Sequence, residues 1–180
     1  MKIKEFGVEV WMNAYETQCQ YNLAETCVES ITLGQLLEFA GKRESILDEL
    51  LPMKLTYGAI EGTERLRDLI AGLYERQQRG NVSVTHGAIG ANALVYQTLV
   101  EPGDHVVSVA PTYQQHYSIP QSLGAEVSIL RLREENAFLP DLAELRGMVR
   151  SNTRVIALNN PNNPTGSLMD RACLLYTSPS

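Results

Sequence analysis

Short β-branched runs alternate with helix-like segments over the second half of the sequence, and this rhythm limits the possible folds more than any other feature. The β-branched runs span residues 82–85, 105–109, 125–130 and 154–158. The helix-like segments between them span residues 88–100, 112–122 and 141–150, with turns at Gly103-Asp104 and Gly124. Strands that alternate with helices pair as parallel sheets covered on both faces. We therefore predict an α/β fold, a three-layer sandwich with a mainly parallel sheet.

The first half of the sequence has a different pattern. Up to about residue 40 it is irregular, and Thr32 precedes an apolar-periodic stretch that predicts a short helix after an N-terminal arm. Thr63 is a suitable cap for a longer helix that runs to about Gln78. Its apolar residues at helical spacing are Leu66, Leu69, Ile70 and Leu73.

Composition excludes several classes of protein. A chain of 180 residues with 44% hydrophobic content has enough apolar residues for a core, and its net charge of -6 leaves no basic excess for nucleic acid or anionic membranes. Residues 1–10 contain no long apolar run, so we expect neither a signal peptide nor a membrane anchor, and a cytoplasmic location. Cys19, Cys27 and Cys173 have neither zinc-site spacing nor the density of a disulfide scaffold, so no metal site is expected.

The segment Thr85-His86-Gly87-Ala88-Ile89-Gly90 ends one predicted strand and begins a helix. Parallel sheets bind ligands beyond the carboxyl ends of their strands, where helix N-termini also lie. The free amides of Ala88 and Ile89 would suit an anion such as a phosphate. A tight strand-to-helix turn needs the same small residues, so both interpretations stay open. The segment has neither the glycine spacing of a dinucleotide site nor the lysine of a triphosphate loop.

Two further segments follow predicted strands. Tyr113, after Pro111-Thr112, is placed to offer its ring to a planar ligand, although a core aromatic under a helix would also fit. Asn163 lies in the run Asn159-Asn160-Pro161-Asn162-Asn163-Pro164-Thr165-Gly166, between two proline-containing turns. A side-chain amide held in this way can donate to a ligand oxygen, and a plain loop would seldom need so specific a run.

Together these segments resemble the large domain of fold type I pyridoxal-phosphate enzymes, the class I/II aminotransferases in particular. Asn163-Pro164-Thr165-Gly166 is the most recognisable run, and the resemblance covers about residues 51–170. Supporting motifs are Tyr57 followed by Gly62 and Leu66-Arg67, Thr85-x-Gly87-Ala88, Glu101-Pro102-Gly103-Asp104, and Pro111-x-Tyr113-x-x-x-Tyr117.

The resemblance implies pyridoxal 5'-phosphate as cofactor and an amino acid and a 2-oxo acid as substrates. The amides of Ala88 and Ile89 would hold the cofactor phosphate, Tyr113 would stack on its ring, and Asn163 would bond the ring hydroxyl oxygen. Tyr57 resembles the tyrosine that reaches the phosphate in the neighbouring subunit, which implies a homodimer. Residues 1–45 would then be the arm and short helix, and 46–170 an incomplete cofactor-binding domain.

The resemblance also implies a lysine that bonds the cofactor, an aspartate and a substrate-binding arginine, all well beyond residue 166. The sequence has only Lys2, Lys4, Lys42 and Lys54, so we assign no catalytic residue and expect an inactive fragment. We expect residues 171–180 to be a non-native tail. Residues 21–25 depart from the family pattern, which leaves the substrate open. Other chemistry on the same scaffold, such as elimination, decarboxylation or cyclisation, and a cofactor-sensing regulatory domain are the alternatives.

Overall fold

The computed structural model describes residues 2–24 and 27–177. The chain divides into two compact units, which are treated separately below. The sheet unit comprises Met1–Ala24 and His86–Ser180, and the helical unit comprises Glu25–Thr85. Across the described ranges, no helix is long and apolar enough to cross a membrane.

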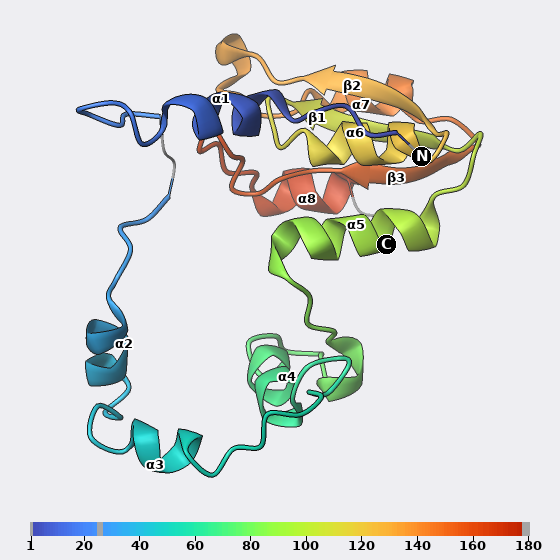
Figure 1. Ribbon diagram of the computed structural model, residues 1–180. Coiled ribbons are helices and arrows are strands. Elements are labelled where there is room, and N and C mark those ends of the chain that lie inside the picture. Colours follow the sequence, from blue (N-terminus) through green and yellow to red (C-terminus); the bar gives the residue numbers. More distant parts are fainter. Residues whose placement is uncertain (1, 25–26, 178–180) are drawn as a thin grey trace. The chain divides into compact units, whose positions relative to one another are not determined.

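Three parallel strands form the centre of the sheet unit (Figure 1). They are β1 (His105–Ala110), β2 (Glu126–Arg131) and β3 (Thr153–Ala157), in the order β2-β1-β3. Val106 on the central strand lies opposite Val127 of β2 and Val155 of β3. The first five residues of β1 are all buried, because the strand has a neighbouring strand on each side and apolar side chains pack on both faces. The predicted strands at 105–109, 125–130 and 154–158 are confirmed to within a residue or two.

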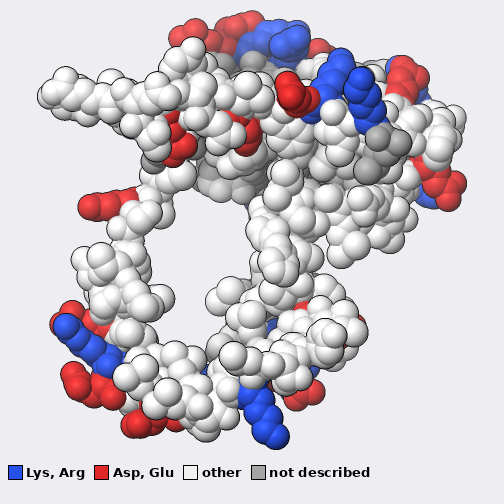
Figure 2. Space-filling model, in the orientation of Figure 1, with Lys and Arg blue, Asp and Glu red and all other residues white. Residues whose placement is uncertain are grey.

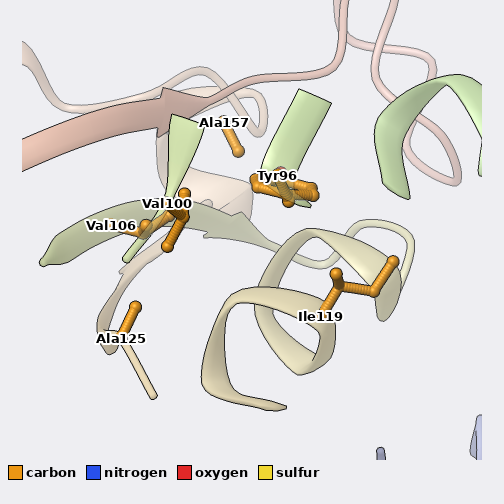
Figure 3. Close-up of a cluster of buried hydrophobic side chains, with 6 residues drawn as sticks. All are labelled: Tyr96, Val100, Val106, Ile119, Ala125 and Ala157. Carbon is orange, nitrogen blue, oxygen red and sulfur yellow. The ribbon is translucent and has the colours of Figure 1, made fainter. Parts of the chain in front are cut away.

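Helices cover both faces of this sheet, as the alternation of side chains along the strands requires. On one face, α5 (Gly87–Leu99) and α6 (Gln115–Ser122) pack against the strands. The buried cluster there is drawn in Figure 3 and consists of Tyr96, Val100, Val106, Ile119, Ala125 and Ala157. On the other face α7 (Leu142–Met148) contributes Leu145 to a cluster with Val107, Val109, Leu130 and Leu132. The prediction of a three-layer α/β arrangement is confirmed.

Sharp turns return the chain between helices and strands. Gly124, predicted as a turn residue, has a φ of +92°, and a Cβ there would lie 3.2 Å from Cβ of Pro102. Glycine is therefore needed for both conformation and space. Helix α6 begins at Gln115 and not at the predicted Thr112, because Pro111 to Gln114 form the turn that leaves β1.

The remaining elements of the sheet unit are α1 (Gly7–Tyr15), the short 3-10 helix η2 (Glu134–Asn136) and α8 (Arg171–Thr177). Helix α1 corrects the prediction of an irregular arm, since residues 7–15 contain no proline and can complete regular helical bonds. Helix α8 lies within the segment expected to differ from the family. Whether residues 171–180 are a non-native tail stays a prediction. The division of the chain at residues 45 and 170 also stays a prediction. Glu25 and residues 178–180 lie outside the described residues.

The helical unit contains α2 (Leu33–Phe39), α3 (Ile46–Leu50), α4 (Glu64–Ala71) and η1 (Arg79–Asn81). Thr32 caps α2 in a capping box with Gln35, and the Thr63 hydroxyl accepts the Leu66 amide at the start of α4, as predicted. Helix α4 is shorter than predicted, since it ends before Gly72, a poor helix former.

The predicted strand at 82–85 is wrong. The segment is extended but joins no sheet; the Val84 amide donates to the Glu61 carbonyl at 2.9 Å. A β-branched run favours an extended backbone, whereas a strand also needs a paired neighbour, which residues 2–24 and 27–177 do not supply.

Candidate functional site

Two loops meet at the carboxyl edge of the sheet and join two of the predicted site residues. Tyr113 lies in the loop after β1, and Asn163 lies in the loop after β3. The Asn163 Nδ2 atom donates to the Tyr113 hydroxyl at 3.0 Å. The Tyr113 side chain is 46% exposed, so it is not a core aromatic. The ring and the amide are thus held together at the edge where parallel sheets bind ligands.

Asn162 holds the second loop in place. Its side chain is almost fully buried, and Nδ2 donates to the Pro111 carbonyl at 3.2 Å and to the Thr165 hydroxyl at 2.8 Å. The backbone closes the same turn, because the Gly166 amide donates to the Asn162 carbonyl at 2.7 Å. The bond to Pro111 ties the two loops together one residue from Asn163. Sequence reasoning singled out Asn163 and missed this supporting role of its neighbour.

Helix α5 presents its N-terminus at the same edge. A short turn joins α5 to β1, so the helix runs opposite to the strand and begins where the strand ends (Figure 1). Gly87 enters the helix with a φ of +68°, and the His86 side chain does not cap it. The amides of Ala88 and Ile89 therefore lie in the first turn, where intrahelical acceptors are missing and the helix dipole favours an anion.

A buried hydrogen bond fixes α5 against α6. The Tyr96 hydroxyl lies 2.9 Å from Nδ1 of His116, and Tyr96 is 3% exposed. Burial raises the pKa of Tyr96 to about 12 and lowers the pKa of His116, so both groups are neutral near pH 7. This bond sets the position of α5 relative to the helix that follows Tyr113.

Four buried polar atoms near the two loops have no hydrogen-bond partner within the part of the chain that the structure describes. They are Thr112 Oγ1, Gln115 Oε1, Asn159 Nδ2 and Asn162 Oδ1. All four follow β1 or β3, at the carboxyl edge. An unpartnered buried polar atom costs roughly 1 to 3 kcal/mol, and such atoms are concentrated at functional sites. This edge therefore holds buried donors and acceptors that a polar ligand could satisfy.

Tyr57 belongs to the helical unit. Its side chain is fully exposed, in a segment without helix or strand between α3 and α4. The described ranges contain no cluster of three or more histidine, cysteine or acidic side chains suited to a metal ion. The structure thus brings Tyr113 and Asn163 together. The convergence of Ala88 and Ile89 on them stays a prediction, as does the contact of Tyr57 with the cofactor of a neighbouring subunit.

Comparison with known proteins agrees with this geometry. A family model described as aminotransferase class I and II matches residues 41–175. The chain belongs to that family. It is 33% identical over 167 residues to capreomycidine synthase of Streptomyces vinaceus, covering 91% of this chain and 42% of that protein. It is 32% identical over 134 residues to an arginine–pyruvate transaminase of Pseudomonas aeruginosa, covering 72% of this chain and 34% of that protein.

A solved structure supports the fold independently. The crystal structure of a PLP-dependent aminotransferase from Streptococcus suis superposes with a TM-score of 0.94 and 45% sequence identity, over 98% of this chain and 48% of that chain. The chain therefore spans about half the length, or less, of the proteins that it matches.

Proposed function

We propose that this chain is the cofactor-binding part of a pyridoxal-phosphate-dependent aminotransferase. Such an enzyme would transfer an amino group between an amino acid and a 2-oxo acid. The observation that carries the proposal is the hydrogen bond between Asn163 Nδ2 and the Tyr113 hydroxyl at the carboxyl edge of the sheet. Family membership over residues 41–175 supports it. The bound cofactor supplies an electron sink for the bonds at the α-carbon of the amino acid.

Each proposed residue has chemistry that suits one part of the cofactor. The amides of Ala88 and Ile89, in the first turn of a 13-residue helix, would hold the phosphate. The partly exposed ring of Tyr113 would stack on the pyridine ring. The Asn163 amide, already oriented by its neighbours, would donate to the ring hydroxyl oxygen.

The cofactor roles are testable by binding alone. Asn163→Ala should raise the cofactor Kd about five- to tenfold, because one hydrogen bond contributes roughly 1 to 1.4 kcal/mol. Asn136→Ala, at an exposed asparagine of η2, is the matched control and should leave Kd unchanged. Fluorescence titration with pyridoxal phosphate measures both variants. Equal Kd values for Asn163→Ala and the control would remove Asn163 from the site.

The reaction itself is tested by the products formed. The test uses a full-length parent that also carries the cofactor lysine, because the only lysines of this chain are Lys2, Lys4, Lys42 and Lys54. With its cofactor, that parent should convert an amino acid and a 2-oxo acid into the matching pair, with one 2-oxo acid consumed for each amino acid formed. An altered or cyclised amino acid that forms without consumption of a 2-oxo acid would point to other chemistry in the family. This is the most informative alternative to test, because the chain also matches a synthase. Cofactor binding by that parent without turnover, across a broad panel of both substrates, would favour a regulatory role.

We also propose a cytoplasmic homodimer in which Tyr57 reaches the partner's cofactor phosphate. Tyr57 is fully exposed in the helical unit, so this unit leaves its side chain accessible to a partner subunit. Tyr57→Phe should weaken cofactor binding about ten- to a hundredfold, because a hydrogen bond to a charged group contributes roughly 1.5 to 3 kcal/mol.

Mixing experiments distinguish a site shared between two subunits from a site formed within one subunit. In the full-length parent, Tyr57→Phe subunits combined with subunits that lack the cofactor lysine should regain activity, because a mixed dimer confines both defects to one site. A monomer at working concentration, or no recovery despite verified subunit exchange, would show that Tyr57 does not act across an interface.

A further inference from the structure

The side chain of Gln114 binds the N-terminal segment to the turn that carries Tyr113. Its Oε1 atom accepts the Gly7 amide at 3.0 Å, and its Nε2 atom donates to the Glu5 carbonyl at 2.8 Å. Nε2 also donates to the Ser118 hydroxyl at 3.1 Å, one helical turn along α6. A glutamine amide has two donor hydrogens and one carbonyl oxygen, and here both groups are engaged.

Packing alone holds the N-terminal segment weakly. Helix α1 has no buried residue, and Glu5 and Gly7 are exposed. Only Phe6 and Met12 are partly buried in this stretch. A helix of nine residues is marginal in water unless tertiary contacts support it. The bonds from Gln114 to the backbone of residues 5 and 7 are therefore a main determinant of where this segment lies.

We propose that Gln114 is a positioning residue that fastens the N-terminal segment, residues 4–7, to the start of α6. Tyr113 is its immediate neighbour, so the segment and the proposed stacking ring are held by one turn. The consequence for substrate binding rests on the proposed function: with the segment fastened, α1 and residues 16–24 are kept at the sheet unit, where they can restrict access to the site. Gln114 itself need not touch substrate or cofactor.

Substitutions on both sides of the contact can break it. Gln114→Ala removes the whole amide, and Gln114→Glu keeps the acceptor but removes both donors. Gly7→Pro removes the donor of the segment instead. Gly7 is the first residue of α1, where proline is favoured, and Phe6 before it is extended with φ −79° and ψ 109°.

Two matched controls leave the contact intact. Gly7→Ala keeps the amide, and a Cβ there meets nothing within 4 Å. Gln121→Ala removes an exposed glutamine from the same helix, α6. Neither control should change the exposure of the N-terminal segment.

Hydrogen exchange over residues 8–15 and trypsin cleavage after Lys4 report directly on that segment. Gln114→Ala removes both bonds to the segment and should speed exchange and cleavage roughly tenfold, since two hydrogen bonds of about 0.7 kcal/mol each correspond to a factor of ten. Gln114→Glu and Gly7→Pro each remove one of the two bonds and should speed both rates about threefold. Rates equal to those of the wild type in Gln114→Ala and Gly7→Pro would overturn the proposal. Faster rates in the two controls as well would also overturn it, because the effect would not depend on this contact.

A kinetic measurement tests the consequence for the site. In a full-length parent that carries the cofactor lysine, release of the segment should raise KM for the amino acid with little change in kcat or in cofactor Kd, because the Tyr113–Asn163 contact stays intact. A fall in cofactor affinity equal to that of Asn163→Ala would instead place Gln114 in the cofactor site and contradict a positioning role. If a full-length parent that carries the cofactor lysine shows no transamination at all, the proposed function fails, while the exchange rates still decide whether Gln114 fastens the segment.

Discussion

The sheet unit and the helical unit are stabilised by different interactions. In the sheet unit, Val106 and Leu130 are 0% exposed, and the two apolar clusters lie on opposite faces of the strands. In the described part of the helical unit, Ala71 is the one buried hydrophobic residue, whereas Leu55 and Ile60 are almost fully exposed. Figure 2 shows the charged side chains in small scattered groups, with wide stretches of other residues between them.

The helical unit depends instead on arginine contacts. Arg67 donates from Nε to the Val82 carbonyl at 2.8 Å and from Nη2 to the Arg79 carbonyl at 3.0 Å, and its Nη1 lies 2.6 Å from a Glu61 carboxylate oxygen. Arg79 pairs in turn with Asp68. The sheet unit therefore buries enough apolar surface to fix its own part of the site. Burial of the exposed apolar residues of the helical unit against another protein surface would stabilise it, which agrees with the proposed dimer.

The largest expected effect is on the free energy of unfolding, and it should differ between the two units because their leucines differ in burial. Leu130→Ala should lower the free energy of unfolding by roughly 2 to 5 kcal/mol, because it leaves a cavity in a fully buried part of the sheet. Leu69→Ala, at a leucine that is 62% exposed on α4, should change it by less than about 0.5 kcal/mol. Urea denaturation followed by circular dichroism measures both. Similar losses for the two variants would show that the units do not differ in this way.

A smaller effect is expected from the arginine contacts. Arg67→Lys should destabilise the helical unit by roughly 1.5 to 3 kcal/mol, because lysine lacks the planar fork that reaches two carbonyls and a carboxylate together. The Arg67 side chain is only 13% exposed, so solvent screens these contacts weakly. Faster hydrogen exchange at the Val84 amide would report the loss. Arg65→Lys, at an exposed arginine of α4, is the control, and equal exchange in the two variants would contradict the role of Arg67.

The sequence was most informative where structure follows from local chemistry and repeated spacing. Periodicity and capping depend on residues that are close in the sequence. This is why we could predict the strands around Val106, Val127 and Val155 and the cap at Thr63. The strand at 82–85 was predicted from the same β-branched pattern and is wrong, because pairing is a long-range property.

The site residues also divide into those that local sequence predicts and those that depend on long-range contacts. Tyr113 and Asn163 lie in turns with an unusual composition, and the structure brings them together. Gln114 and Asn162 act through side-chain bonds to backbone atoms that are distant in the sequence, those of Glu5 and Gly7 for Gln114 and that of Pro111 for Asn162. Such a bond leaves no spacing or periodic signal in the sequence, so only the structure reveals these two residues.

The smallest expected effect concerns a buried histidine of the sheet unit and its response to pH. His105 begins β1 between the two outer strands and is 0% exposed. Nδ1 lies 2.8 Å from the Thr153 hydroxyl, and Nε2 lies 2.9 Å from the Ser128 hydroxyl. Burial lowers the pKa of His105 below 6.5, and nearby Arg150 lowers it further, while Glu126 acts in the opposite direction.

A lowered pKa means that the folded protein binds the His105 proton less readily than the unfolded chain does. The stabilising contribution is therefore complete above about pH 6.5 and is lost as the pH falls toward the lowered pKa. For one proton, the free energy of unfolding cannot change by more than about 1.4 kcal/mol per pH unit. His105→Gln removes this titration, so its free energy of unfolding should fall less steeply than that of the wild type between about pH 7 and 5.5, above the range where most carboxylates titrate. His116→Gln provides the comparison, because burial lowers the pKa of His116 as well and its removal should flatten the slope in the same direction. Parallel slopes for the wild type and His105→Gln would show that His105 takes up its proton equally in the folded and unfolded states.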